Sequence, residues 1–457
     1  MNYEIENIDG VKVYTSTKKF ESENKLGKFM EDTDYDLLVD HDADFYAPPP
    51  FGENNGEDNI IFKYRRGIFT EEEQISAYDA LRDAAVESQN RGIAAGPRGE
   101  KLEVKGRGGR EWVTPYHEAV LEWMINPPSS LFDEIDLEGI RNKFKNSTHE
   151  EETRGRVWLR SEVMKEYPDY FGWFDRWADA QLELTREDRK ANAEWVNKKF
   201  ISGTSYAQSV NSGIAGFFDR YPRIPYGRLT SYTEQNWDKY TGCYPFMRKL
   251  SDKFEELLPR RYGVQARTAD KIDERFRVAG KDTPFTTITV NKNFRTAAHR
   301  DAGDLTEGFS NLSVIAKDKE WQGGYLVLPE FRVAVNIRPG DLLLINNHEG
   351  IHGNTELLPP EGKTIEDMER ISLVCYFREK MLELGNFDYE KTRKEFVDFR
   401  RKNENHELWR PLWNGVSPSM WESQEWYDYL LENGGSNMLN YYHPKANKGD
   451  VLLTDFA

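Results

Sequence analysis

Residues 321–354 read WQGGYLVLPEFRVAVNIRPGDLLLINNHEGIHGN and contain the clearest strand pattern in the chain. The stretch contains three short apolar runs, GGYLVLPE, FRVAVNI and GDLLLIN, each bounded by glycine, proline or a charged residue. Runs of this length and composition are typical of strands rather than helices. The glycine pair 323–324 and the sequence RPGD are turn signals. The stretch therefore predicts three consecutive strands joined by tight turns.

Similar runs flank this stretch on both sides. TPFTTITVNKNF (283–294) and FSNLSVIAK (309–317) precede it, and RISLVCYF (370–377) follows it. Six such runs within about 100 residues, with no helical pattern between them, indicate an antiparallel sandwich or jelly roll. We therefore expect the part of the chain from about residue 283 to residue 380 to be a compact β structure.

Helical patterns dominate elsewhere in the chain. Residues 71–90 read as an amphipathic helix with Ile75, Tyr78, Leu81 and Ala85 on one face, and residues 245–258 as another helix, stopped by Pro259. Residues 111–200 are mainly helical in pattern, and the chain becomes helical again after 380. Residues 202–240 are interrupted by glycine, proline and serine, which predicts an ordered loop region.

Composition limits the class of protein. The chain has 457 residues, a net charge of −17 and two cysteines, Cys243 and Cys375. So few cysteines exclude a disulfide framework and a multi-thiolate zinc site. No apolar run approaches the roughly 20 residues of a membrane span, and the N-terminus lacks a secretory pattern. We expect a soluble, intracellular protein without a membrane partner.

The overall acidity is unfavourable for a nucleic-acid binder, although the local charge decides binding. Residues 31–44, EDTDYDLLVDHDAD, hold seven acidic side chains and no basic one. We expect four regions: an acidic, partly disordered segment over 1–60, a mainly helical region over 61–200, a β domain over 201–380 and a helical extension over 381–457.

A candidate metal site follows the strand at 283–294. His299 and Asp301, in RTAAHRDAGD (295–304), stand two residues apart and would point to the same side of the sheet. Two imidazoles and one carboxylate form the facial triad of ferrous oxygenases, whereas an isolated His-x-Asp is usually incidental surface chemistry. The third ligand must come from a distant strand. We favour His352, which ends its strand in a His-Gly-Asn turn, over His348, which would be a surface or substrate-facing residue.

A candidate carboxylate site lies on the last strand of the β region. Arg370 and Ser372 face the same way on that strand, and a guanidinium with a neighbouring hydroxyl matches a carboxylate. The distal carboxylate of 2-oxoglutarate requires such a site. The alternative is an arginine in a structural ion pair, in which case Arg378 is the reserve candidate.

Two segments have the composition of a nucleic-acid contact. In 202–240, arginines alternate with aromatic rings, a composition suited to stacking on bases and gripping phosphates, or to a packed loop over a barrel mouth. Residues 91–110 form a basic, glycine-rich loop, which is either a phosphate contact or a solvated hairpin. The tentative substrate residues are Arg220, Tyr221, Arg223, Tyr226 and Arg228 from the first segment, and Arg107 and Arg110 from the second.

Residues 291–378 resemble the double-stranded β-helix core of the Fe(II)/2-oxoglutarate-dependent dioxygenases. The resemblance rests on NKNFRTAAHRDAGD, GFSNLSVIAKD, the stretch 321–354 and RISLVCYFR, and it is strongest to the TET/J-binding-protein branch, which oxidises methyl groups of thymine or 5-methylcytosine. It implies an α+β fold with a jelly-roll or cupin-like core, a helical N-terminal elaboration and a helical C-terminal tail. It also implies that His299, Asp301 and His352 hold Fe(II), and that Arg370 and Ser372 hold 2-oxoglutarate.

Three hypotheses follow from the sequence. The first is a dioxygenase that uses Fe(II), 2-oxoglutarate and O2 to hydroxylate the methyl group of a pyrimidine in DNA, the base leaving the stack to react. The second is a hydroxylase of a protein side chain or small metabolite on the same barrel, which suits the acidic balance. The third is a β-sandwich binding module without catalytic activity. Hydrolase motifs are absent from the sequence.

Overall fold

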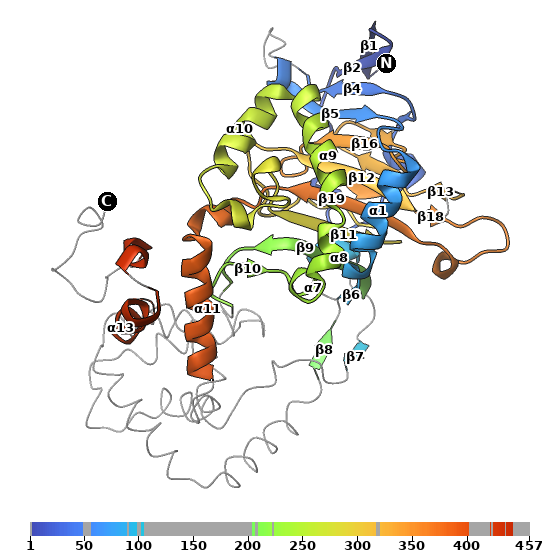
Figure 1. Ribbon diagram of the computed structural model, residues 1–457. Helices are drawn as coiled ribbons and strands as arrows, with labels where there is room; N and C mark the ends of the chain where they lie inside the picture. The colour runs from blue at the N-terminus through green and yellow to red at the C-terminus, as the bar shows by residue number, and fades with distance from the viewer. Residues whose placement is uncertain are drawn as a thin grey trace, which may run out of the picture. The chain divides into compact units, whose positions relative to one another are not determined.

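The computed structural model describes residues 2–48, 56–88, 91–97, 102–104, 203–205, 209–221, 224–316, 320–401, 421, 424–434 and 436–441. The chain divides into two compact units. Residues 1–100 and 206–391 form the first unit, to which most of the helices and strands labelled in Figure 1 belong. Residues 101–205 and 392–457 form the second unit.

One large sheet organises the first unit. Its path, in hydrogen-bonding order, is β1-β2-β4-β5-β16-β12-β19-β11-β9-β10, and β6 pairs with β9 off that path. Most neighbours are antiparallel; β2 and β4 are parallel. The strands are β1 (Tyr3–Ile8), β2 (Val11–Ser16), β4 (Ala43–Tyr46), β5 (Ile60–Arg65), β6 (Glu87–Ser88), β9 (Val210–Phe218), β10 (Arg228–Leu229), β11 (Thr287–Lys292), β12 (Ser310–Ala316), β16 (Leu342–Ile345) and β19 (Arg370–Tyr376).

A smaller sheet, in the order β17-β14-β15-β3, packs against the large one. Its strands are β17 (Gly353–Asn354), β14 (Leu326–Leu328), β15 (Val333–Val335) and β3 (Leu37–Val39), and β13 (Gln322–Gly323) pairs separately with β18 (Leu357–Leu358). Leu312 and Val314 of β12 share one buried cluster with Leu326 and Leu328 of β14. Alternation along each strand thus places one apolar set between the two sheets.

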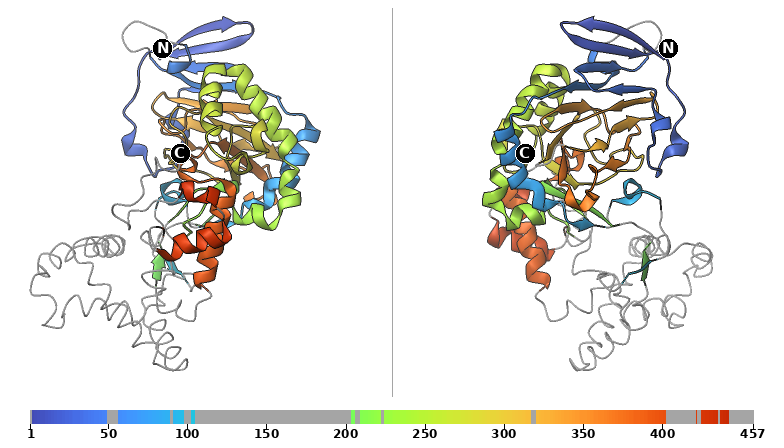
Figure 2. Two further views of the ribbon diagram at one scale, coloured as in Figure 1. Left: turned by 60° about the vertical axis from the view of Figure 1, so that its left-hand side comes forward. Right: turned by 90° about the vertical axis from the view of Figure 1, so that its right-hand side faces the viewer.

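Helices cover the opposite face of the large sheet. Ile315, Leu342 and Leu373 belong to a second buried cluster together with Met247 and Leu250 of α9. Figure 1 and Figure 2 show the helices along this side of the sheet. They are α1 (Glu71–Leu81), α7 (Ser231–Gln235), α8 (Trp237–Thr241), α9 (Tyr244–Leu257) and α10 (Pro259–Ala269). Pro259 ends α9, as the sequence predicts, and also occupies the first position of α10, where proline is favoured.

Short 3-10 turns connect these elements. They are η1 (Glu23–Lys25), η2 (Asp32–Asp34), η3 (Gly56–Asn59), η4 (Arg82–Ala84), η5 (Gly92–Ala95), η6 (Glu274–Phe276), η7 (Gly280–Asp282), η8 (Ile365–Asp367) and η9 (Glu379–Glu383). All six β-rich runs predicted between 283 and 377 contain strands, namely β11, β12, β14, β15, β16 and β19. The fold is therefore a mixed, sheet-rich arrangement with helices, in agreement with the α+β class expected from the sequence.

The expected boundary near residue 60 is wrong. Strands β1 to β5 lie within residues 3–65 and belong to the two sheets, and Phe45 and Phe62 are fully buried. The high average acidity conceals this, because the charges lie in turns or are neutralised: Asp44 pairs with Lys63 and Arg65 at 3.0 and 2.8 Å. The described part of residues 1–60 is thus folded and contributes strands to the two sheets, rather than being a partly disordered segment.

Two further predictions need correction. The helix predicted over 71–90 ends at Leu81, and Ile75, expected on its buried face, is 51% exposed. The loop predicted over 202–240 contains β9, a nine-residue strand paired with β11. Its glycines conceal the strand pattern, because a Cβ on Gly213 would lie 1.8 Å from the carbonyl oxygen of Ala84, so the backbones touch at that position.

Several predictions fall outside the described residues. The helical region expected over 111–200 lies wholly among them, as do Arg107 and Arg110. In the second unit, β7 (Leu102–Val104) pairs with β8 (Gly203–Ser205), and the C-terminal part contains α13 (Gln424–Asn433) and η11 (Ser436–Tyr441). Helix α11 (Phe387–Arg401) begins in the first unit. None of the described helices is long and apolar enough to cross a membrane.

Candidate metal centre and its cavity

Two distant segments meet at the predicted metal site. The backbone N–H of His299 donates to the carbonyl of His352 at 2.9 Å, and that of His352 donates to the carbonyl of His299 at 3.0 Å. The N–H of Asp301 donates to the carbonyl of Asn347 at 3.0 Å. Backbone pairing therefore fixes the register of the two segments, and with it the positions of all three side chains.

The donor atoms of the three residues converge. Nε2 of His299 lies 3.3 Å from Oδ1 of Asp301, and Nε2 of His352 lies 3.9 Å from Oδ2 of the same carboxylate. One donor atom from each residue lies within 4.8 Å of the other two. Two imidazoles and a carboxylate at this spacing match the donor set of a ferrous facial triad. The structure brings together the three residues that the sequence singled out.

Backbone carbonyls orient both imidazoles. Nδ1 of His299 donates to the carbonyl of Ala297 at 2.8 Å, and Nδ1 of His352 donates to the carbonyl of Gly350 at 3.0 Å. A carbonyl oxygen only accepts, so each Nδ1 carries a proton, and in the neutral form of each ring Nε2 has a lone pair for a metal. This arrangement resembles the outer-shell support that metal-binding histidines usually have.

Burial and mutual charge set the protonation of the three groups. Burial, together with the charge of His299, lowers the pKa of His352 to about 4. Burial opposes charge on His299 as well, but its hydrogen bond to Asp301 raises the net pKa above the ordinary value. Burial also disfavours the Asp301 carboxylate, yet both imidazoles hold its pKa at about 2. At neutral pH the carboxylate is ionised and His352 is neutral, as a metal requires.

His348 does not join the centre. Its Nε2 lies 3.4 Å from Oγ1 of Thr306, and it lines a small separate cavity together with Gln265 and Phe309. This separation agrees with the choice of His352 as the third candidate ligand.

The three candidate ligands line a cavity of about 610 Å³. Its walls come from β9, β11, β12, β14 and β19 and from the segment around η5. A volume of this order holds a small-molecule ligand with room for a further group. Arg370 and Ser372 line the same cavity.

Arg370 is a buried cation without a carboxylate partner among the described residues. It is 5% exposed, and its Nε has no hydrogen-bond partner there. Burial, together with the nearby charge of Arg338, lowers its pKa to about 10. An unpaired buried guanidinium is unfavourable for folding, so its presence beside the cavity indicates a site for an anion. The residues present thus fit one carboxylate group of a dicarboxylate, and within the described ranges Arg370 does not form the structural ion pair considered as an alternative.

Arg378 is engaged elsewhere. Its Nε donates to the carboxylate of Asp219, and its guanidinium lies over the ring of Phe218, 4.0 Å from the centroid. A cation that already has a carboxylate partner is a poorer receptor for a second carboxylate. The reserve candidate of the sequence analysis is therefore less suitable than Arg370.

Most of the tentative substrate residues near 220 are tied into the fold. Arg220 donates to Glu390, which is fully buried, and Arg228 donates to the carbonyl of Asp219 at 2.9 Å. Tyr226 is 7% exposed, whereas Tyr221 is 55% exposed. Arg223 lies outside the described residues. Of the alternatives, the packed loop describes Arg220, Tyr226 and Arg228 better than a free binding surface does.

Sequence reasoning missed two polar residues of the cavity. Arg91 lines it and donates to the carbonyl of Gly213 at 2.9 Å, and burial lowers its pKa. The basic composition of residues 91–110 indicated that this segment is a candidate contact, but it did not single out Arg91, the first residue of the segment. Asp304 also lines the cavity, accepts a hydrogen bond from Ser310 at 2.7 Å, and has its pKa raised to about 8 by burial and by the charge of Asp301.

Comparison with known families supports the resemblance given by the sequence. Residues 213–379 match the model of Tet_JBP, described as the oxygenase domain of the 2OGFeDO superfamily. The chain is 36% identical over 170 residues to Thymine dioxygenase JBP1-B of Trypanosoma cruzi, covering 36% of this chain and 19% of that protein. It is 37% identical over 171 residues to Bifunctional helicase and thymine dioxygenase JBP2 of Trypanosoma brucei brucei, covering 37% and 15%.

The chain thus spans less than a fifth of the length of these curated relatives. Among solved structures, NgTET1 in complex with 5mC DNA aligns over 40% of this chain and 69% of that chain, at 18% identity and a TM-score of 0.32. A score this low does not establish a common fold. The resemblance to the Tet_JBP oxygenase domain is confirmed for residues 213–379.

Proposed function

We propose that this protein is an Fe(II)- and 2-oxoglutarate-dependent dioxygenase that hydroxylates the methyl group of a pyrimidine base, thymine or 5-methylcytosine, in DNA. We also infer that the two facing sheets form a double-stranded β-helix. One observation carries the proposal: the His299–Asp301–His352 cluster and the buried Arg370 with an unpartnered Nε line one cavity, inside the stretch that matches the oxygenase domain.

The three candidate ligands and the pair Arg370 and Ser372 have different roles in this proposal. His299, Asp301 and His352 would hold Fe(II), which with O2 and 2-oxoglutarate supplies the oxidising power for hydroxylation of a C–H bond. The carbonyls of Ala297 and Gly350 hold both Nδ1 atoms, which would leave both Nε2 atoms available to the ion. Arg370 would bind the distal carboxylate of 2-oxoglutarate, and Ser372, two residues along the same strand, would add a hydroxyl donor.

The apolar part of the cavity excludes water from the reacting atoms. Leu312, Val314 and Leu326 line it and are buried in the core between the sheets. A dry wall strengthens every charge interaction in the site and limits side reactions. The pocket therefore offers charged groups for the cosubstrate and an apolar surface around the reacting carbon.

The choice of DNA rests on the relatives, whose names describe thymine dioxygenases. A base inside a duplex would have to leave the stack to reach the cavity, at a cost of a few kcal/mol. Arg91 faces the cavity and is a candidate contact for that base or for 2-oxoglutarate. Arg107, Arg110 and Arg223 stay predicted phosphate contacts, whereas Arg220 and Arg228 serve the packing of the loop.

The test is anaerobic reconstitution with Fe(II) and 2-oxoglutarate, followed by admission of oxygen in the presence of DNA carrying thymine or 5-methylcytosine. Nucleosides are analysed by mass spectrometry, and succinate is measured in parallel. We expect a hydroxylated nucleoside and succinate from the parent protein, and neither from His299→Ala. The matched control is His348→Gln, which removes a nearby histidine that does not reach the cluster.

The two readouts separate the hypotheses. Succinate without a modified base would retain the oxygenase and favour a protein side chain or metabolite as substrate. If neither product forms from folded, iron-loaded protein, the enzyme hypothesis fails and the hypothesis of a binding module without catalytic activity is favoured.

A further inference from the structure

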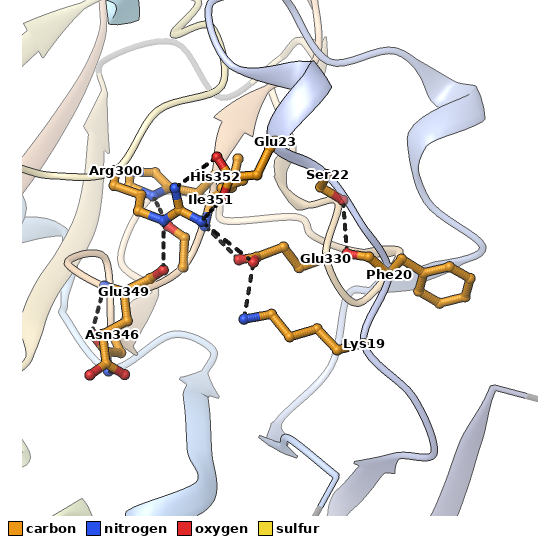
Figure 3. A network of polar contacts seen from close by, with 11 residues as sticks. Lys19, Phe20, Ser22, Glu23, Arg300, Glu330, Asn346, Glu349, Ile351 and His352 are labelled. Atoms are coloured by element: carbon orange, nitrogen blue, oxygen red, sulfur yellow. Dashed lines mark hydrogen bonds and ion pairs between the residues drawn. The ribbon is translucent and has the colours of Figure 1, made fainter.

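Glu330 is a buried carboxylate beside the candidate metal centre. It follows β14, is 4% exposed, and lies outside the cavity lining. Its Oε2 accepts the backbone N–H of Ile351 at 2.8 Å, directly before His352. Its Oε1 lies 3.0 Å from Nζ of Lys19 and 3.7 Å from Nη2 of Arg300 (Figure 3). Burying a carboxylate is costly unless it is paired in this way.

In the sequence, Arg300 lies between two of the candidate ligands, His299 and Asp301. Its Nε donates to the carbonyl of Glu349 at 2.9 Å. Its two terminal nitrogens donate to the carboxylate of Glu23 at 2.6 and 3.3 Å. Such a bidentate pair fixes geometry as well as charge. Arg300 therefore links the segment of His299 and Asp301 to the segment of His352 and to η1.

Glu330 completes this link on the other side. It holds the segment of His352 by the Ile351 N–H and faces Arg300 with its second oxygen. Asn346 supports the same loop, because its side chain donates to Glu349 at 3.0 Å (Figure 3). The two segments that carry the candidate ligands are thus joined by side chains as well as by their backbone pairing.

The N-terminal part of the chain takes part in this arrangement. The N–H of Phe20 donates to the carbonyl of Glu330 at 2.8 Å, which places Lys19 beside the buried carboxylate. Gly27 donates to the carbonyl of Ala298, and Ala298 donates to the carbonyl of Lys28, both at 2.8 Å. Residues 19–28 lie outside the range 213–379 that matches the family model, yet they contact the segment carrying His299.

We propose that Glu330 and Arg300, together with Lys19 and Glu23 of the N-terminal segment, position the metal ligands. The inference deepens the proposed function and rests on its metal centre. Without Glu330 the Ile351 N–H would lose its buried acceptor, and the segment of His352 would be free to shift from the other two ligands. Partners that orient metal ligands from outside the coordination shell commonly contribute tenfold to about hundredfold in metal affinity.

Cobalt(II) binding under anaerobic conditions tests this proposal, because its visible spectrum reports ligand geometry without turnover. The main variant is Glu330→Gln, which keeps the shape but has a single acceptor oxygen for Ile351 on one side and Lys19 and Arg300 on the other. We expect cobalt affinity to fall by about tenfold or more, with an altered visible spectrum. Thermal unfolding of the metal-free proteins is measured alongside.

Two exposed variants form a matched pair. Glu23→Gln removes one carboxylate from the pair with Arg300. Asp36→Asn removes one carboxylate from a similar bidentate pair, in which Arg332 donates at 2.7 and 2.6 Å, but this pair does not reach the metal segments. Both positions lie in the N-terminal part of the chain. We expect Glu23→Gln to weaken cobalt binding severalfold and Asp36→Asn to leave it unchanged.

The outcomes separate this inference from the proposed function. Cobalt affinity and spectrum of Glu330→Gln equal to the parent's would overturn it, as would an equal loss in Glu23→Gln and Asp36→Asn. If Glu330→Gln fails to fold, the matched pair decides alone. A parent that binds cobalt but oxidises no base refutes the proposed substrate and leaves the positioning role standing, whereas a parent that binds no metal refutes both.

Discussion

His299 and His352 exchange a pair of backbone hydrogen bonds, and their rings lie with centroids 4.4 Å apart. The pairing joins two segments that are distant in sequence, and Asp301 closes the cluster from the same segment as His299. Because the backbone determines this geometry, the candidate ligands are preorganised for a metal ion before it binds.

Removing a candidate ligand should abolish metal binding. In Asp301→Asn the cluster keeps its shape but loses the charge on which both imidazoles converge. We expect cobalt affinity to fall by more than the roughly hundredfold that an outer-shell change causes. Titration followed by the visible spectrum measures this loss. His348→Gln serves as the control, and an Asp301→Asn protein that binds cobalt like the parent would exclude Asp301 as a ligand.

Metal binding should release one proton at mildly acidic pH. His352 has a pKa of about 4 and Asp301 a pKa of about 2, so at pH 5 to 6 neither carries a proton that a metal ion would displace. The pKa of His299 is raised despite its burial, so His299 is protonated there and must lose its proton. Affinity should therefore rise about tenfold per pH unit and level off above the pKa of His299. Release of two protons, measured by calorimetry in two buffers, would contradict the low pKa of His352.

Arg370 should be required for binding of 2-oxoglutarate, and it should lower the free energy of unfolding of the ligand-free protein. Arg370→Met removes a buried guanidinium whose Nε is unpartnered, so we expect the ligand-free protein to gain roughly 1 kcal/mol in its free energy of unfolding. The parent should show a rise in melting temperature with increasing 2-oxoglutarate, because the ligand binds only the folded state. The variant should show none. A similar thermal shift in both proteins would place the dicarboxylate elsewhere.

Arg220 should act on stability rather than on DNA affinity. Its partner Glu390 is fully buried and also accepts the backbone N–H groups of Gly227 and Gly385. Arg220→Ala removes this cation from the buried carboxylate, and we expect the free energy of unfolding to fall by about 2 kcal/mol. Chemical denaturation measures the loss, and Arg220→Ala combined with Glu390→Gln should recover part of it. Loss of DNA binding without loss of stability would restore Arg220 as a substrate contact.

The strands after residue 283 and the three residues of the candidate metal centre could be predicted from the amino-acid sequence. Both follow from local patterns: apolar residues at a period of two, and a His-x-Asp at the end of a strand with a histidine closing another. The Arg-x-Ser on β19 belongs to the same class, because two residues on one strand share a face whatever the rest of the chain does.

Which charged side chains are paired within the fold could be learned only from the three-dimensional structure. Arg220 and Arg370 look alike in sequence, yet Arg220 meets a carboxylate from α11 and Arg370 meets none among the described residues. The N-terminal strands and β9 were not predicted, because their strand character also depends on partners that are distant in sequence. The charge of an acidic residue is neutralised only when folding brings a cation beside it, as Lys63 lies beside Asp44. A glycine is required within a strand only when folding brings another backbone against it, as Ala84 lies against Gly213.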